Sequence, residues 1–225
     1  MSNLQIILGG VLAVALAWLY MRQLRRKAAD SRKAADILFS EVLPLLENAE
    51  LRPGNSAGSW KVTGHFAGEF FQFTSVTDTL AVRKLPSLWL LVTLPKPQPL
   101  PASIDVMRRA AGPTTFSNFD FLPHRLATPQ GFPEDAIVKT DGTEVTLPTQ
   151  ALALAQPILG GRQGKEVLLS PKGLRIVVQI AEADRVRYGV FREARFEGAK
   201  IATDQAMDIM NTLLAMDRNL AGKNG

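Results

Sequence analysis

The feature that most constrains this chain is an uncharged apolar run at its amino terminus, which a basic segment follows directly. The run extends from Leu4 to Met21 and reads LQIILGGVLAVALAWLYM. At about 1.5 Å of rise per residue, a helix of this length spans roughly 27 Å, close to the thickness of the hydrocarbon core of a bilayer. The sequence therefore predicts a single transmembrane helix within residues 1–21.

Aromatic and basic residues mark the carboxyl end of this run and predict its place at the membrane interface. Trp18 and Tyr20 are expected at the level of the lipid headgroups, where amphipathic rings are favoured. Six basic residues follow within twelve positions, and they are Arg22, Arg25, Arg26, Lys27, Arg32 and Lys33. Basic residues next to a span stay on the cytoplasmic side. We therefore expect an outside amino terminus and a cytoplasmic domain at the plasma (inner) membrane of a bacterium.

Two other interpretations of the apolar run are less consistent with its flanks. A cleaved signal peptide begins with a basic region, whereas residues 1–21 contain no Lys or Arg. The small-residue pattern Ala13-Val14-Ala15 lies inside the apolar run and not after it. A helix buried in a soluble core is the remaining alternative. The flanking charges favour a retained anchor over both.

The same basic segment accounts for the net charge of the whole chain. The chain has 26 Lys and Arg against 21 Asp and Glu, and residues 22–33 contain six of the basic and one of the acidic residues. Residues 34–225 are therefore neutral overall. This distribution favours contact with anionic lipid headgroups and gives little reason to expect nucleic-acid binding. The absence of cysteine excludes disulfides, zinc–thiolate sites and cysteine nucleophiles.

Residues 22–51 are expected to form a helical stalk, because they are rich in Ala and Leu. Gly9, Ala13 and Ala17 form a small-residue face in the span that would allow two helices to approach closely. Self-association through the span and stalk is one interpretation. The alternative, which we favour, is that such residues are common in spans and that the stalk packs on its own domain.

Residues 52–59 have the composition of a linker, and residues 60–225 are long enough for one globular domain. Ser87 to Leu94 is nearly continuous in apolar character and is expected at the centre of a sheet. The expected strands are 60–63, 69–76, 79–83, 87–94, 136–139, 144–147, 166–169, 174–180 and 185–196. The expected helices are 104–111, 149–156 and 203–220. Together, these strands and helices predict an α+β domain with one mainly antiparallel sheet and a C-terminal helix.

Two stretches of the domain are candidates for docking a partner. Pro97, Pro99 and Pro101 could present an extended ligand to a proline-recognising protein. A stiff connector is the favoured alternative. Four phenylalanines gather within 17 residues, and they are Phe116, Phe119, Phe121 and Phe132. Some of these rings are expected to fill the core beneath a long loop, and the others to offer an apolar surface.

Signals for catalysis, cofactors and metals are weak. Ser56 lies in Gly54-Asn55-Ser56-Ala57-Gly58, which matches the G-x-S-x-G nucleophile pattern, but that motif needs a strand before it and a helix after it. A flexible turn is the favoured interpretation. Residues 161–165 resemble a phosphate-binding loop only in part, since Glu166 replaces the required Ser or Thr. His65 and His124 are too far apart to indicate a metal site. We expect no cofactor and no metal.

The leading hypothesis is a non-enzymatic accessory or scaffold subunit, anchored by one span, whose cytoplasmic domain binds a protein partner or membrane complex. The alternatives are a membrane-tethered hydrolase that uses Ser56 or carboxylates from 104–142, and a module that binds the lipid surface through its basic segment. The runs TLAVRKLPSLWLLVTLP and LLSPKGLRIVV resemble stretches of bacterial membrane-anchored proteins. That resemblance attaches to no named family and implies no activity.

Overall fold

The computed structural model divides the chain into two compact units, Met1–Leu38 and Phe39–Gly225, which are described separately. It describes residues 3–56, 58–78, 85–110, 112–185, 188, 189, 194 and 196–222, without the side chains of residues 3–11, 13 and 14. The predicted strand at 79–83 lies outside the described residues. So does most of the strand predicted at 185–196.

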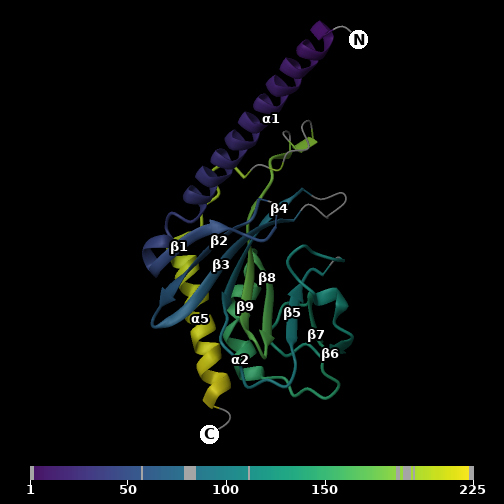
Figure 1. Ribbon diagram of the computed structural model, residues 1–225. Coiled ribbons are helices and arrows are strands. Elements are labelled where there is room, and N and C mark those ends of the chain that lie inside the picture. Colours follow the sequence, from purple (N-terminus) through teal and green to yellow (C-terminus); the bar gives the residue numbers. More distant parts are fainter. Residues whose placement is uncertain are drawn as a thin grey trace. The chain divides into compact units, whose positions relative to one another are not determined.

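The first unit is one continuous helix, α1 (Asn3–Leu38), which includes the apolar run and the basic segment (Figure 1). In the part of the chain that the structure describes, no helix is both long and apolar enough to cross a membrane. The helix ends well before the predicted end of the stalk at residue 51. A 3₁₀ turn at Leu43–Leu45 contains Pro44, and strand β1 (Glu47–Pro53) follows. Proline cannot continue a helix because it lacks the amide N–H.

The second unit contains a single antiparallel sheet, which has nine strands among the described residues. Their order across the sheet is β1-β2-β3-β4-β9-β8-β5-β7-β6. Besides β1, the strands are β2 (Trp60–Phe66), β3 (Glu69–Asp78), β4 (Ser87–Leu94), β5 (Ile104–Arg108), β6 (His124–Leu126), β7 (Ala136–Thr140), β8 (Gly164–Ser170) and β9 (Gly173–Glu182). The predicted α+β class and antiparallel sheet are confirmed.

Strand β4 lies inside the sheet between β3 and β9, as its apolar sequence predicts. Successive side chains of a strand point to opposite faces. Leu90 and Val92 are fully buried on one face, while Trp89 and Leu91 are buried on the other. Both faces of the sheet are therefore covered at this strand, which explains why the sequence here does not alternate.

Helices cover one face of the sheet, and the largest is α5 (Thr203–Gly222), which contacts β4 and β9. Two short helices, α2 (Thr149–Leu154) and α3 (Gln156–Gly160), lie on the same side, where α2 packs on α5 and α3 on β8 (Figure 1). The buried stripe of α5 consists of Ala206, Ile209, Met210, Leu213, Met216, Asp217 and Leu220. The predicted C-terminal helix at 203–220 and its apolar stripe are confirmed.

The opposite face is covered by the segment that connects β5 to β7, which we call the Phe loop (residues 109–135). It contains a 3₁₀ turn at Phe119–Phe121 and the short strand β6. Phe116 packs on Trp89 with 5.2 Å between ring centroids. The buried cluster beneath the loop consists of Val76, Trp89, Leu91, Met107, Phe116, Phe119 and Val177.

The sequence was wrong about the element at 104–111, which was expected to be a helix and is strand β5. Ile104 to Met107 are all buried, and β5 pairs with β7 on one side and with β8 on the other. The hydrogen bonds that β5 forms with a strand on each side outweigh the helical propensity of residues 104–111. The strand expected at 144–147 is also absent, since these residues form no strand, and the strand expected at 136–139 is β7, which pairs with β5 and β6.

Candidate binding site

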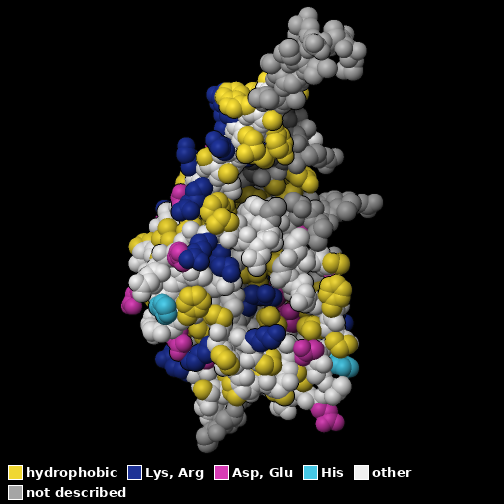
Figure 2. Space-filling view, in the orientation of Figure 1, with side chains coloured by type: hydrophobic (Ala, Val, Ile, Leu, Met, Phe, Trp, Pro, Cys, Tyr) yellow, Lys and Arg dark blue, Asp and Glu magenta, His cyan; other side chains and the backbone are white. Residues whose placement is uncertain are grey.

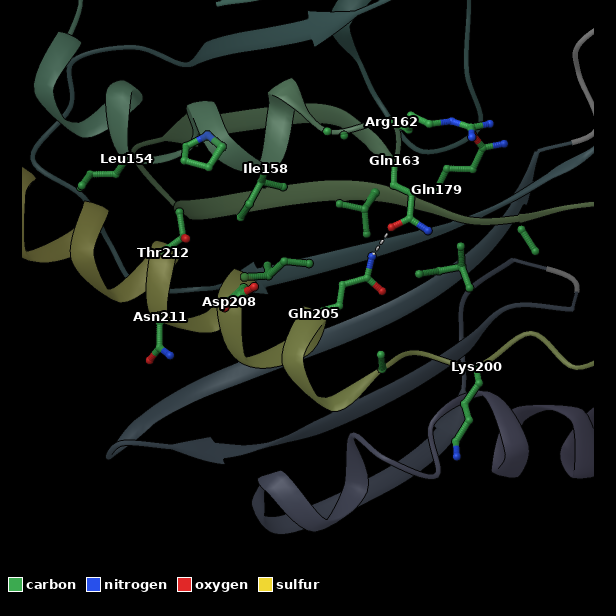
Figure 3. A pocket seen from close by; sticks show the side chains of 18 of the residues that line it. Leu154, Ile158, Arg162, Gln163, Gln179, Lys200, Gln205, Asp208, Asn211 and Thr212 are labelled. Carbon is green, nitrogen blue, oxygen red and sulfur yellow. Dashed lines mark hydrogen bonds between the residues drawn. The ribbon is translucent and has the colours of Figure 1, made fainter. Parts of the chain in front are cut away.

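The helix-covered face carries an open groove of about 1430 Å³ between α5 and the α2–α3 pair. Val178 and Ile180 of β9 form its floor, and Ile158 of α3 forms part of one wall. On the other wall, α5 contributes Gln205 and Thr212, which point into the groove (Figure 3). Val178 lines this groove while Val177 belongs to the cluster beneath the Phe loop, so the two sites occupy opposite faces.

A pair of glutamine side chains bridges the groove. Gln205 donates from Nε2 to Oε1 of Gln163 at 2.8 Å, and Figure 3 shows the two amides pointing toward each other from opposite walls. A primary amide has two N–H donors and an acceptor oxygen with two lone pairs. The Gln163 amide therefore retains a donor, and the Gln205 amide retains an acceptor. Together they match the C=O and N–H of one peptide group.

Charged residues of both signs line the groove, and they are Arg109, Arg162, Lys200, Glu182 and Asp208. Asn211 and Lys200 point away from its interior (Figure 3), and Lys200 forms an ion pair with Glu41 at 2.7 Å. The Lys200 ammonium and hydrogen bonds from Thr203 hold the pKa of the Glu41 carboxyl below its usual value. Asp208 also lines the groove. The site is therefore nearly neutral and does not select a highly charged ligand.

The loop between α3 and β8 is held at the end of the groove by two consecutive arginines. Arg108 donates to the carbonyl oxygens of Leu159 and Gly161 at 2.6 and 2.9 Å. Arg109, whose φ is +49°, donates to the carbonyl of Gly164 at 2.8 Å. A side chain at Gly164 would lie 2.3 Å from the Ile158 carbonyl oxygen. The loop thus directs carbonyls at cations, whereas a phosphate-binding loop directs N–H groups at an anion.

A second unusual group lies on the opposite face, where charged side chains are buried beneath the Phe loop. Glu166 of β8 is fully buried and forms an ion pair with Arg175 of β9 at 2.7 Å. Asp105 of β5 is only 2% exposed. Burial, and then the negative charge of Glu166, raise the pKa of the Asp105 carboxyl well above its usual value. No described cavity opens on these residues, so they form an internal polar cluster.

The predicted aromatic docking surface is largely interior. Phe116 and Phe119 are buried under the Phe loop, at 7% and 2% exposure, because their rings fill the space above Trp89 and Met107. They are therefore not offered to a partner, and the docking role predicted for them is corrected. Phe121 is 78% exposed and remains a surface residue. Phe132 is half-buried.

The proline-rich stretch is fixed to the end of α5 by polar side chains. Lys96 contacts Asp217 at 2.9 Å, and Gln98, which is buried, donates to the same carboxylate at 2.8 Å. Glu69 and Asp217 together raise the pKa of Lys96. The prolines between and after these residues are exposed, and they are Pro97, Pro99 and Pro101. The anchoring at Lys96 and Gln98 favours the stiff-connector interpretation.

Ser56 lies in the loop of the β1–β2 hairpin, so a strand follows it and not a helix. Ser59 closes this turn by donating from Oγ to the Ser56 carbonyl at 2.7 Å. This geometry differs from a strand–turn–helix nucleophile elbow. Among the described residues, no three His, Cys, Asp or Glu side chains gather as they would around a metal ion.

The residues predicted at the membrane interface all lie exposed on α1, and they are Trp18, Tyr20, Arg22, Arg25, Arg26, Lys27, Arg32 and Lys33. The Arg22 guanidinium lies 5.3 Å from the centroid of the Trp18 ring. Of the small-residue face, Ala17 is exposed. At Gly9 and Ala13 the structure describes the helical backbone alone.

Comparisons with protein-family models, with curated protein sequences and with solved structures give no significant match to this chain. Of the groove residues, only those at 161–164 were singled out from the sequence, as part of a partial phosphate-binding loop. The others were missed because α3, β9 and α5 meet only in the folded domain. The sequence does contain a signal for the buried acids. Asp105 interrupts an apolar stretch, and Glu166 directly precedes one. An acid inside a buried strand is rare unless it is paired.

Proposed function

We propose that this chain is a membrane-tethered, non-catalytic binding protein whose domain holds an extended segment of a protein partner in the groove between α5 and α3. The observation that carries the proposal is the groove itself, with an apolar floor and a bridging amide pair. The partner would be an accessory or complex-forming protein at the same membrane.

The size and chemistry of the groove favour a polypeptide over a small molecule. Pockets for small ligands usually measure about 300–1,000 Å³ and enclose most of the ligand. This groove is larger, at about 1430 Å³, and open. The remaining donor on Gln163 and acceptor on Gln205 suit a main-chain amide, while the partly exposed Ile158 and Ile180 suit an apolar side chain. The near balance of charge argues against a nucleic acid.

Strand addition at a sheet edge is a less suitable mode of binding for this domain. The edge strand β1 carries Glu47, Glu50, Arg52 and Pro53, and its register shifts between Glu47 and Glu50. Charges, proline and bulges on an edge strand oppose pairing with another strand. The opposite edge, β6, has only three residues. A groove on the sheet face is therefore the better docking site.

The proposed tether rests on the sequence of the first 33 residues. The apolar run at 4–21 and the basic residues after it favour one span with the domain on the cytoplasmic side. An alkaline phosphatase fused after Gly225 should be inactive in intact bacterial cells. High phosphatase activity from this fusion would place the domain on the other side of the membrane.

The binding proposal is tested by filling the groove. Thr212 points into it and the adjacent Asn211 points away, so Thr212→Trp and Asn211→Trp form a matched pair (Figure 3). Each variant is purified from gently solubilised membranes, and co-purifying proteins are quantified by mass spectrometry. Circular dichroism verifies that both variants are folded.

We expect the wild type and Asn211→Trp to retain the same partner, and Thr212→Trp to lose it. Equal recovery of the partner with both variants would show that the partner does not bind in the groove. Repeated recovery of the wild-type protein alone would contradict partner binding altogether.

A further inference from the structure

The cluster beneath the Phe loop contains two buried acids, and one part-buried arginine, Arg175, forms an ion pair with one of them. Arg175 donates from Nη2 to Oε1 of Glu166 at 2.7 Å. Oδ1 of Asp105 and Oε2 of Glu166 are buried and have no hydrogen-bond partner among the described residues. Two ionised carboxylates that share one site repel each other, and burial removes the water that would screen them. One of the two is therefore more stable in its protonated form.

The strand register places the two acids on the same face of the sheet. Asp105 pairs with Leu168 and Glu166 pairs with Met107, so the acids are diagonal neighbours on β5 and β8. Diagonal neighbours on one face of antiparallel strands are within reach of each other when a side chain is long. Glu166 is committed to Arg175 by its ion pair. Asp105 is consequently the acid that holds the proton.

The two lysines near Asp105 form their hydrogen bonds with backbone carbonyl groups. Lys139 of β7 lies 4.9 Å above the Phe119 ring and contacts the Asp120 carbonyl at 3.5 Å. Lys165 of β8 donates to the carbonyl oxygens of Arg108 and Arg109 at 2.8 and 3.0 Å. Both ammonium groups are thus bound to other atoms. The positive charges of Arg175 and Lys139 favour ionisation of Asp105, but burial and the negative charge of Glu166 oppose it more strongly.

The Phe loop is attached to the sheet at the same carboxyl group. The Ser117 hydroxyl contacts Oδ2 of Asp105 at 3.5 Å, and the amide of Phe119 donates to Ser117 Oγ at 3.1 Å. Phe116 and Phe119, on either side of Ser117, are the loop side chains buried over Trp89 and Met107. Residues 116–119 therefore lie directly over the Asp105 carboxyl. The Ser117 hydroxyl favours the ionised form of this carboxyl, whereas burial, which has the larger effect, favours the protonated form.

We propose that Asp105 is a proton-dependent latch: its protonated carboxyl keeps residues 116–119 packed on the sheet, and loss of the proton to solvent releases them. Ionisation would place a second negative charge beside Glu166 in a site that excludes water, and the charge becomes hydrated only if the loop lifts. Phe116 and Phe119 would then leave Trp89, which exposes an apolar surface opposite the groove.

The latch is tested by the fluorescence of Trp89 in the full chain, solubilised in detergent. Trp18→Phe and Trp60→Phe leave Trp89 as the one tryptophan, since the chain has three. Buried carboxyl groups titrate as high as about pH 8–9, so emission and acrylamide quenching are followed from about pH 5 to pH 9. We expect emission to shift to longer wavelength and quenching to increase as the pH rises, while circular dichroism stays unchanged.

Asp105→Asn, which imitates the protonated acid, should abolish this pH dependence and keep the low-pH emission. Asp120→Asn changes an exposed carboxyl of the same loop and should retain the wild-type profile. A wild type without pH dependence, or an Asp105→Asn variant that keeps it, would overturn the proposal. If Asp105→Asn does not fold, the protonation state of Asp105 is measured in the unsubstituted chain from the ¹³C NMR chemical shift of its carboxyl carbon. An ionised carboxylate at neutral pH would also overturn it.

Discussion

The two faces of the sheet are covered by different elements and bury different kinds of side chain. On the helix-covered face, the stripe of α5 is apolar except for Asp217, and charged residues of both signs line the groove. On the loop-covered face, Asp105, Glu166 and Lys165 are buried next to Trp89 and Phe116. One face thus leaves an accessible, nearly neutral groove, and the other encloses charge.

The difference follows from the elements that cover each face. A long amphipathic helix presents apolar side chains at regular spacing and needs no polar partners from the sheet. The Phe loop lacks a regular stripe, so the strands beneath it supply hydrogen-bonding groups as well as apolar ones. Figure 2 shows the surface counterpart of this mixture, with basic and acidic side chains interspersed over the sheet on the face in view. The two coverings therefore distinguish the face that we propose to bind a partner from the face that we propose to respond to its charge state.

The largest expected effect is the loss of Arg175, the cation that is paired with a buried acid. Arg175→Met leaves Glu166, which is fully buried, without its ion-pair partner. Breaking a buried pair by removing one partner typically costs about 3–5 kcal/mol. We expect urea denaturation, followed by circular dichroism, to show a loss of this size in the free energy of unfolding.

Arg125→Met is the matched control, because Arg125 is an exposed arginine on the same covering segment. Its effect should stay within about 0.5 kcal/mol. Equal losses from both arginine variants would mean that the loop-covered face does not depend on its buried ion pair.

A comparable but apolar defect is expected on the helix-covered face. Leu213 of α5 is fully buried, and Leu213→Ala should lower the free energy of unfolding by about 2–5 kcal/mol through lost contacts and a cavity. Met207→Ala on the same helix removes a side chain that is 36% exposed and should cost much less. A Leu213→Ala loss no larger than that of Met207→Ala, in the same denaturation experiment, would show that α5 is not packed as described.

The pH dependence of stability should also differ between acids at the surface and the acid beneath the loop. The pKa of Asp105 is raised in the folded chain, so the folded state binds this proton more tightly than the unfolded state. Stability should fall as the pH rises from the ordinary range of an aspartic acid through the raised pKa, by up to about 1.4 kcal/mol per pH unit. Asp105→Asn should flatten this part of the profile.

The opposite sign is expected from Asp135, whose pKa is lowered mainly by its hydrogen bond with Arg108. Its contribution to stability is present above the ordinary range of an aspartic acid and is lost as the pH falls through the lowered pKa. Asp135→Asn should therefore alter only the acidic part of the profile. An unchanged alkaline part in Asp105→Asn would contradict the assignment of the proton to Asp105.

The smallest effect on stability is expected at the amide pair. Gln205→Ala removes one neutral hydrogen bond, to Gln163, and should cost about 1 kcal/mol or less. The same change should weaken partner recovery strongly, because it removes the acceptor proposed to bind the partner's main chain. A large loss of stability with normal partner recovery would make the pair structural and not a binding element.

The elements with a strong sequence pattern were predictable. The apolar run at 87–94 predicted the interior strand β4, the strands expected at 166–169 and 174–180 are β8 and β9, and the helix expected at 203–220 is α5. Strand β5 was missed because Asp105 disturbs its apolar character and its identity depends on pairing with β7 and β8. These partners are separated from β5 by at least 27 residues in the sequence.

The candidate sites were much harder to predict. The stretch that contains Gln163 was considered only as a partial phosphate-binding loop, and Gln205 is an ordinary surface residue by sequence. The two become a pair only because the loop after α3 and helix α5 lie on the same face of the sheet. Asp105, Glu166 and Arg175 likewise come from three strands that meet through the register. The phenylalanines were predictable as a group, but the burial of Phe116 and Phe119 and the exposure of Phe121 depend on the course of the Phe loop.

The central claim, that the groove and not the opposite face binds the partner, is tested most directly by site-specific photocrosslinking in living cells. A photoreactive phenylalanine analogue replaces either Gln205 in the groove or Thr74, which pairs with Leu91 of β4 and so lies on the loop-covered face. The account predicts a discrete crosslinked partner from position 205 and none from position 74. A crosslink from position 74 alone, or equal crosslinks from both positions, would contradict it.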